Sequence, residues 1–481
     1  MSHTFITLVT GIIRKGDLIS FPRNLRTLAA TILPAPLFQR LSGSAIAKRL
    51  ARGSLWSLAG SATSRLLVLV AMVGVARVLG KASFGEFGLI QATLGVAGLM
   101  AGLGLGATAT RFVAQYAATD PDRAGRVIGL VMQVSWGTVL AATGVLVGAS
   151  SLIARRVLEA PHLESALMWG ALLMAANVLR GIQSGVIAAV ERFDLIAKLN
   201  VLEGIVSLIT MVVLAHYLEV QGALLGLAAA SIAVWIVGRV MLGGVLKARG
   251  IRVSYQDCWQ EWRILHGYSL PSLLAGFVAT PVLWFCMTWV AHRPNGYAEL
   301  GLYNAAYQWH GPIIFIPMIL MSVSIPVLVQ EWELGRKERF RKVTLWICGL
   351  TLTCALPPVL LIAVLSPWIM TLYGPGFREG WLILVLLVAA APFHALSNIA
   401  SGALLGMNRA WWVLGINLFW GATLLTLTVW LTPAWGVRGL ATAFLAAYSV
   451  LGIASVVMVL FGSRCAIHKL PGLVMNEGET A

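Results

Sequence analysis

Two segments of the chain carry the same residues at the same spacing: Ser184-Gly185 … Arg192 … Asn200 … Gly204 and Ser401-Gly402 … Arg409 … Asn417 … Gly421. Each position in the second segment lies 217 residues after its partner, and the register continues to Gly222 and Gly439. A further match, at an offset of 216, pairs Phe84-Gly85-Glu86-Phe87 with Leu300-Gly301-Leu302-Tyr303. The repeat predicts that the chain consists of two copies of one structural unit.

The composition predicts that both copies lie in a membrane. Of the 481 residues, 58% are hydrophobic and only 11% are charged, whereas a soluble domain carries about 25% charged residues. Apolar stretches of about 18 or more residues recur along the whole chain, and each is long enough to cross the hydrocarbon core as a helix. We therefore predict an all-α polytopic membrane protein.

About twelve transmembrane helices are expected, in two six-helix lobes. They are placed at residues 54–76, 86–110, 126–154, 165–189, 199–217, 221–245, 267–290, 302–329, 344–365, 380–406, 411–431 and 437–461. With the N-terminus inside the cell, 25 of the 35 Lys and Arg residues fall inside, 7 outside and 3 within helices. This excess follows the positive-inside rule and places both termini in the cytoplasm. Six spans separate equivalent positions. Because six is an even number, the two lobes have the same orientation in the membrane and form a parallel repeat.

The predicted domains follow from these spans. They are a basic cytoplasmic arm (1–52), an N-lobe (53–250), a cytoplasmic linker (251–266), a C-lobe (267–465) and a cytoplasmic tail (466–481). The net charge of +16 is attributed to cytoplasmic loops and not to nucleic-acid binding. The five cysteines form no CxxC pair and are interpreted as packing residues. With no phosphate-loop motif, no HExxH and no nucleophile beside a base, we expect neither an enzyme nor a cofactor or metal site.

Three arginines inside the predicted spans are the candidate substrate-binding residues. Arg65 lies near the middle of the first span, whereas Arg180 and Arg239 lie nearer the cytoplasmic ends of the fourth and sixth spans. Ionisable groups inside a membrane are costly and usually face a cavity, and a guanidinium can bind phosphate through two hydrogen bonds. The alternatives remain open: Arg65 pairs with a carboxylate such as Glu203 or Glu86, and Arg239 extends to the membrane surface.

Three other residues are candidates for coupling transport to an ion. Glu203 lies in the first turns of the fifth span, and its alternative role is to balance Arg180 and a helix N-terminus. His310 and His394 lie beside Pro312 and Pro392 in the second lobe. Histidine can gain and lose a proton near neutral pH, although a hydrogen-bonded packing role is the alternative for both.

Several short segments resemble one known family. Ala76-Arg77-Val78-Leu79-Gly80 … Phe84-Gly85-Glu86-Phe87-Gly88 and Leu103-Gly104-Leu105-Gly106-Ala107 … Arg111-Phe112 resemble the first hairpin of the Wzx-like polysaccharide and oligosaccharide flippases. Tyr268-Ser269-Leu270-Pro271 and Gly301-Leu302-Tyr303-Asn304-Ala305-Ala306 resemble the openings of their seventh and eighth spans. These flippases belong to the multidrug/oligosaccharidyl-lipid/polysaccharide exporter (MOP) superfamily, and the resemblance covers most of residues 53–465.

The resemblance implies two lobes in a V shape around a central cavity, in the inner (cytoplasmic) membrane. It implies that an undecaprenyl-diphosphate-linked oligosaccharide is moved from the cytoplasmic to the outer leaflet by alternating access, for O-antigen, capsule or exopolysaccharide biosynthesis. By position in their spans, Arg65 and Arg180 match cavity arginines expected to meet the diphosphate. Membrane lipids, a polysaccharide polymerase and chain-length machinery are the implied partners.

The alternative is a cation-coupled multidrug exporter of the same superfamily, whose cavity would need carboxylates. A membrane glycosyltransferase is disfavoured by the short external loops.

Overall fold

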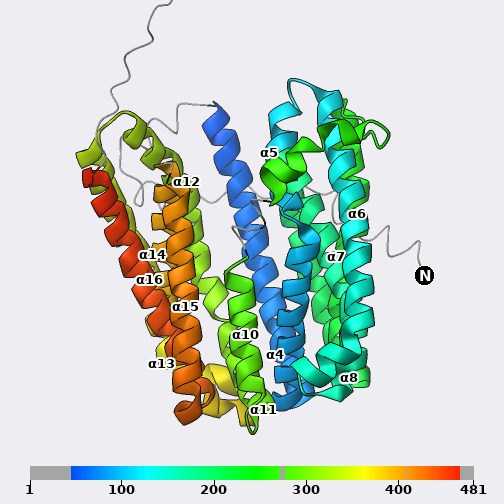
Figure 1. Ribbon diagram of the computed structural model, residues 1–481, viewed down its shortest axis with the longest axis vertical. Helices are drawn as coiled ribbons and strands as arrows, with labels where there is room; N and C mark the ends of the chain where they lie inside the picture. Colours follow the sequence, from blue (N-terminus) through cyan, green and yellow to red (C-terminus); the bar gives the residue numbers. More distant parts are fainter. Residues whose placement is uncertain (1–44, 271–272, 274–276, 408, 466–481) are drawn as a thin grey trace, which may run out of the picture. The chain divides into compact units, whose positions relative to one another are not determined.

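The computed structural model describes residues 45–270, 273, 277–407 and 409–465 (Figure 1). The chain divides into two compact units, Met1–Ser57 and Leu58–Ala481. Within the first unit the described residues are 45–57, which begin a helix. Most of the predicted basic arm and the whole predicted tail therefore lie outside the described residues. The account below concerns the second unit.

The described chain is helical throughout. We call residues 58–248 the first half and residues 279–465 the second half. The elements of the first half are α4 (Ala45–Gly102), α5 (Leu105–Tyr116), α6 (Pro121–Leu152), η1 (Ile153–Val157), η2 (Pro161–Leu163), α7 (Glu164–Ala189) and α8 (Phe193–Ala248). Between the halves lie η3 (Cys258–Glu261) and η4 (Leu265–Ser269). The second half contains α10 (Ala279–Ala291), α11 (Gly296–Tyr307), α12 (His310–Glu333), α13 (Lys337–Leu372), η5 (Pro375–Gly380), α14 (Trp381–Gly406), α15 (Ala410–Trp435) and α16 (Val437–Cys465).

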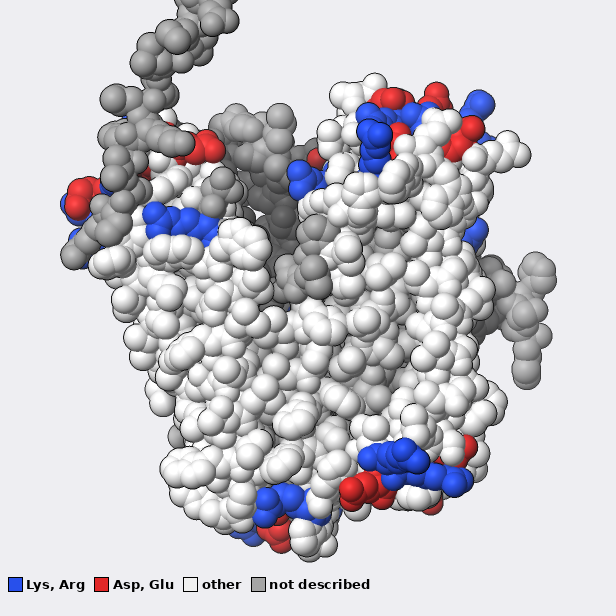
Figure 2. All heavy atoms as spheres, in the orientation of Figure 1, with Lys and Arg blue, Asp and Glu red and all other residues white. Residues whose placement is uncertain are grey.

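Eight helices of the described chain are long and apolar enough to cross a membrane. Charged side chains gather at the two ends of the molecule and leave a broad uncharged band between them (Figure 2). Two of the eight, α4 and α8, contain a non-helical residue in their interior, at Gly80 and Glu219. Each therefore forms two arms and accounts for two of the predicted spans.

The sequence repeat is also a repeat of backbone geometry. Glu219 has φ 49° and ψ −130°, and Gly436, 217 residues later, has φ 55° and ψ −137°. Just beyond these turns, a β-carbon on Gly222 would lie 1.9 Å from the carbonyl oxygen of Leu214, and one on Gly439 would lie 2.7 Å from that of Leu431. The glycines conserved between the two copies thus allow the same tight hairpin in both halves.

The two halves share a hydrophobic core at one end. The largest buried cluster contains side chains from both halves, including Phe84, Phe87, Tyr303 and Tyr373. A second cluster belongs to the other end of the first half and includes Leu105, Val127 and Leu199. We call the end that carries Gly80, Glu219 and Gly436 the closed end, and the opposite end the open end. In Figure 1 the closed end is at the bottom, where α4, α10 and α11 meet.

Candidate functional site: a groove beside the junction of the two halves

The two halves cross at the closed end through a pair of equivalent contacts. A β-carbon on Gly85 would lie 1.8 Å from the carbonyl oxygen of Tyr297, and one on Gly301 would lie 1.9 Å from that of Lys81. Both pairs are related by the offset of 216, so each half makes the same contact to the other. Only glycine permits so close an approach of the two backbones. This crossing has the two-fold relation that a parallel repeat requires.

One position on this crossing differs between the halves. Gly88 in the first half corresponds to Asn304 in the second, and a β-carbon on Gly88 would lie 1.8 Å from the Asn304 amide nitrogen. The Asn304 amide donates to the carbonyl oxygens of Phe84 and Gly85 at 3.4 and 3.5 Å. A side chain of the second half therefore fills space that the first half leaves empty.

Further polar contacts join the halves at the closed end. The Arg77 Nε donates to the carbonyl oxygen of Leu372 at 2.6 Å, and Lys81 Nζ lies 3.6 Å from Glu379. In the reverse direction, the Tyr297 hydroxyl donates to the carbonyl oxygen of Leu158 at 2.7 Å. These contacts fasten the two halves together at the closed end.

The segment that links the halves is fastened to the first half. Arg123 of α6 forms two hydrogen bonds with Glu261, at 2.8 and 3.0 Å, and Ser254 N donates to the Gly125 carbonyl oxygen at 3.3 Å. Cys258 is buried beside α6, where burial raises the pKa of its thiol. Farther along, the hydroxyl oxygens of Ser269 and Thr108 of α5 are 2.6 Å apart. The linker is thus attached to the first half as far as Ser269.

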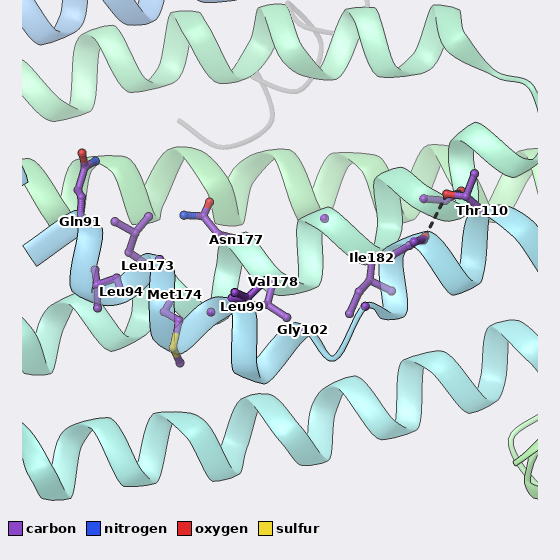
Figure 3. A pocket seen from close by; sticks show the side chains of 17 residues that line it. Gln91, Leu94, Leu99, Gly102, Thr110, Leu173, Met174, Asn177, Val178 and Ile182 are labelled. Atoms are coloured by element: carbon purple, nitrogen blue, oxygen red, sulfur yellow. Dashed lines mark hydrogen bonds between the residues drawn. The ribbon is translucent and has the colours of Figure 1, made fainter. Parts of the chain in front are cut away.

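A groove of about 720 Å³ runs along the first half between α4, α5 and α7 (Figure 3). Seven glycines line it: Gly95, Gly98, Gly102, Gly104, Gly106, Gly181 and Gly185. Two of them also bring the helices together, because a β-carbon on Gly185 would lie 2.4 Å from the Gly106 carbonyl oxygen. By contrast, a β-carbon on Gly181 would meet nothing within 4 Å. The groove therefore exists because seven of the residues that line it are glycines and have no side chain to fill it.

The groove passes a break between α4 and α5. Leu103 (φ 44°) and Gly104 (φ 68°) both have left-handed backbone conformations, which cost a residue such as leucine about 1–2 kcal/mol. The last carbonyls of α4 and the first amides of α5 lose their helical partners at such a break. The Thr138 hydroxyl donates to the Ala101 carbonyl at 2.7 Å, and α5 begins without a side-chain cap. Backbone donors and acceptors thus meet at one place beside the groove.

The polar side chains that line the groove are neutral. Gln91, Asn177 and Thr110 line it, and no residue with a formal charge does so among the described residues. Figure 3 shows the Gln91 and Asn177 amides directed to the same side. The Asn177 Oδ1 accepts from Ser231 at 3.0 Å, and within the described chain the Gln91 amide makes no hydrogen bond. The Thr110 hydroxyl already donates to the carbonyl oxygens of Gly106 and Gly185, at 3.0 and 3.2 Å. The unused donors and acceptors of the groove therefore come from carboxamides, without net charge.

Arg65 lies where the first half faces the second. Its Nη1 donates to the Gly311 carbonyl oxygen at 3.3 Å, and its guanidinium lies 4.9 Å from the Phe315 ring centroid. The side chain is exposed. In the part of the chain that the structure describes, no carboxylate lies within ion-pair distance of it. The charge of Arg65 is thus balanced by a carbonyl and a ring, not by an anion.

The other two candidate arginines have different surroundings. Arg180 Nη1 donates to Glu203 at 2.5 Å, and the exposed fractions of their side chains are 27% and 14%. This ion pair joins α7 to α8. The guanidinium of Arg239 lies 5.7 Å from the Trp235 ring, which in turn packs against Trp136. Neither arginine lines the groove.

The structure brings His310 and His394 together in the second half. His310 Nε2 and His394 Nδ1 are 3.2 Å apart, and His310 Nδ1 lies 2.9 Å from the Leu387 carbonyl oxygen. A carbonyl only accepts, so His310 carries its proton on Nδ1 and accepts from His394 through Nε2. His394 Nε2 then holds a free lone pair. Tyr307, Phe444 and Tyr448 stack around the pair.

Comparisons with known proteins identify the family and the fold. Residues 50–332, which are more than half of the chain, match the family of polysaccharide biosynthesis proteins, and the chain belongs to that family. The EPS I polysaccharide export inner membrane protein EpsE of Ralstonia nicotianae is 28% identical over 155 residues, 32% of this chain and 35% of that protein. The protein of the same name from Ralstonia solanacearum is 31% identical over 112 residues, 23% of this chain and 26% of that one. The chain thus matches about a third or less of the length of these relatives.

Solved structures with the same fold cover most of the chain. An inward-facing MATE family multidrug transporter of the MOP superfamily has a TM-score of 0.69 at 14% identity, over 83% of this chain and 94% of its own. The lipid II flippase MurJ, in an inward closed conformation, scores 0.67 at 15% identity over 86% and 87%. A MOP superfamily transporter from Pyrococcus furiosus scores 0.66 at 16% identity over 87% and 96%. The predicted family resemblance and the predicted all-helical fold in two parallel repeats are confirmed.

Sequence reasoning did not select the groove residues Gln91, Asn177 and Thr110. Two signals in the sequence pointed to them. The first is the run of glycines from Gly95 to Gly106, a pattern that is also typical of close helix packing in membranes. The second is the presence of carboxamides inside apolar spans, which carries less weight than a charge because a carboxamide costs less to bury.

Proposed function

We propose that the protein is a flippase of the bacterial inner membrane. It moves an undecaprenyl-diphosphate-linked oligosaccharide from the cytoplasmic to the outer leaflet by alternating access, for O-antigen, capsule or exopolysaccharide assembly. Both termini and the open end face the cytoplasm, where the lipid-linked sugar is assembled. It acts as a transporter and not as an enzyme, and a polysaccharide polymerase and chain-length machinery would receive its product.

The observation that carries this proposal is Arg65. The Arg65 guanidinium lies between the two halves and donates a hydrogen bond of 3.3 Å to the Gly311 carbonyl oxygen. Within the described chain it has no counter-ion. Charged groups at this depth are retained where they meet a substrate or a partner, and a diphosphate would supply both charge and paired acceptors. The names of the EpsE relatives, which refer to polysaccharide export and the inner membrane, support the same substrate class.

The His310–His394 pair is our proposed position for a coupling proton. His394 Nε2 can accept a proton without breaking either hydrogen bond of the pair. One added charge inside the aromatic cluster would favour a conformation that admits water, which is how protonation can bias one facing state over the other. Glu203 is a less suitable carrier because it already neutralises Arg180.

The alternative function is cation-coupled multidrug export; one of the solved structures with this fold is a multidrug resistance MATE family transporter. Binding a cationic drug would require a free carboxylate between the halves. Two carboxylates that could serve are engaged: Glu203 with Arg180, and Glu86 with His162 at 2.9 Å. The unpaired positive charge of Arg65 disfavours a cationic substrate.

Deletion of the gene, followed by lipid analysis, tests the proposal. We expect undecaprenyl-linked repeat units to accumulate on the cytoplasmic side. Arg65→Ala should reduce export by at least about a hundredfold, the loss of roughly 3 kcal/mol, and Arg65→Lys should rescue it poorly because lysine lacks the paired donors. Arg239→Ala, at equal expression, is the matched control. Unchanged lipids together with altered drug sensitivity would favour the multidrug exporter instead, and full export by Arg65→Ala would remove the role assigned to Arg65.

A further inference from the structure

We propose that the groove between α4, α5 and α7 is the subsite for the uncharged sugar rings of the transported lipid. The inference rests on the flippase function proposed above and assigns a part of the substrate to a part of the protein. The diphosphate would then lie near Arg65, and the glycan would extend along the groove.

The first step of the argument concerns charge. Gln91, Asn177 and Thr110 are the polar side chains of the groove, and none carries a charge. An anionic group placed there would lose its hydration without gaining a cation, which is costly in a site away from water. The groove is thus suited to a neutral polar ligand and not to the diphosphate itself.

The second step concerns the balance of donors and acceptors. The break between Gly102 and Leu105 lies on the groove, since Gly102 and Gly104 line it, and a helix end and a helix start at one place leave backbone carbonyls and amides without helical partners. The two carboxamides add both kinds of group, because each has two N–H donors and one carbonyl acceptor. A sugar hydroxyl is both donor and acceptor, so a row of hydroxyls can use the donors and the acceptors that this part of the groove leaves without a partner. A pure anion or a pure cation could use only half of them.

The third step concerns shape and the remaining lining. A volume of about 720 Å³ lies within the range of about 300–1,000 Å³ that is typical of small-ligand sites. Leu94, Met174 and Ile182 line the side of the groove beside the amides. A sugar ring has an apolar C–H face and a polar rim, and this combination of apolar wall and amide edge fits both.

The groove also differs from the interior of the second half. The residues equivalent to Gln91, Asn177 and Ser231 are Tyr307, His394 and Tyr448, and these pack together with His310. The same region of the repeat is therefore open and amide-lined in the first half, but filled by rings in the second. A space that is open in one copy, and occupied by rings at the equivalent positions of the other, is better explained by a ligand than by a requirement of the scaffold.

Gly181→Leu is the most direct test. A side chain here would extend into the groove, and its β-carbon would meet nothing within 4 Å, so the helix can accept it without a clash. Gly137→Leu on α6 is the matched control, since its β-carbon also meets nothing within 4 Å and it does not line the groove. Thermal unfolding of both purified variants should match that of the unsubstituted protein.

The measurement compares two probes on the full chain in lipid nanodiscs. One is undecaprenyl diphosphate, and the other is the lipid-linked oligosaccharide extracted from cells of the source organism that lack this protein. We expect the oligosaccharide-bearing lipid to bind at least about tenfold more tightly, the effect of one or two hydrogen bonds. Gly181→Leu, and Gln91→Leu combined with Asn177→Leu, should remove that preference while leaving binding of the bare diphosphate unchanged. Gly137→Leu should keep it.

The outcomes separate this inference from the flippase function. If both lipids bind equally to the unsubstituted protein, or if Gly181→Leu retains the preference, the groove is not a sugar subsite although the flippase function stands. If neither lipid binds and neither is translocated in reconstituted vesicles, the flippase function itself fails. A preference that is lost only in the groove variants supports the assignment.

Discussion

The groove of the first half and the histidine cluster of the second half occupy equivalent places in the repeat, yet one is hollow and the other is filled. Asn177 corresponds to His394 at the offset of 217, and its partner Ser231 corresponds to Tyr448. The Asn177–Ser231 hydrogen bond of 3.0 Å is thus replaced by a ring stack with centroids 4.3 Å apart. The two halves therefore share the same arrangement of helices, but the side chains inside each half differ in kind and in how much space they fill.

The same asymmetry applies to the ion pair beside the groove. Arg180 and Glu203 correspond to Ser397 and Trp420. Trp420 is only 3% exposed and its Nε1 has no partner among the described residues. The second half therefore fills with aromatic volume the space in which the first half keeps two charges.

The largest expected effect comes from a contact that both halves share. Gly85→Val and Gly301→Val should each destabilise the protein by about 4 kcal/mol or more, because each new β-carbon would overlap a backbone oxygen of the other half. Thermal unfolding of the purified protein would measure this. Gly144→Val, whose β-carbon meets nothing within 4 Å, should change little. Similar losses for the two crossing variants would support an equivalent crossing, whereas tolerance of either one would break the symmetry.

A smaller effect is expected where the halves differ. Arg180→Ser leaves Glu203 buried without its partner and should destabilise the protein by about 3 kcal/mol. The double variant Arg180→Ser with Glu203→Trp copies the residues of the second half and should recover much of that loss, because no charge is left uncompensated. A double-mutant cycle by chemical unfolding would measure the coupling. If the changes in the free energy of unfolding of the two single variants simply add, Arg180 and Glu203 do not stabilise the protein as a pair. Ser397 and Trp420 would then not be the counterpart of an ion pair.

The smallest effect concerns the hairpin backbone. Glu219 adopts φ 49° and ψ −130°, almost the conformation of Gly436, and glycine adopts such angles without the strain that other residues bear. Glu219→Gly should therefore stabilise the protein by about 1 kcal/mol, measured as a rise in unfolding midpoint. Gly436→Ala should do the opposite, since its β-carbon would also lie 2.7 Å from the Glu299 carboxylate. A stabilising Gly436→Ala would show that the two hairpins are not equivalent.

Much of the fold could be predicted from local patterns. Apolar stretches of membrane length place the helices, and the glycines at an offset of 216 or 217 place the repeat, because both depend on composition along the chain. The break at Leu103 and Gly104 could not be placed in this way. Helices continue through glycines in many membrane proteins. Where the backbone hydrogen bonds of the helix are broken between α4 and α5 depends on packing against α6 and α7.

The candidate site was predictable in part. Arg65 was selected because a charge inside a span is costly wherever it points. The pairing of Arg180 with Glu203 was one of two open alternatives, because residues 23 positions apart on different helices meet only if those helices pack face to face. The contact between His310 and His394 crosses 84 residues, and no spacing rule extends that far.

The sequence by itself determined that this chain crosses the membrane many times, that it is built from two parallel copies, and that its first half carries an arginine, Arg65, inside a span. The spans and the significance of Arg65 follow from the cost of burying backbone or charge in hydrocarbon, and the two copies follow from residues repeated at a constant offset. Only the tertiary structure decided that the halves join at one end through Gly85 and Gly301, and that the first half keeps an uncharged groove where the second packs rings. Those outcomes depend on which helix faces meet, and that is set by the fit of side chains distant in sequence.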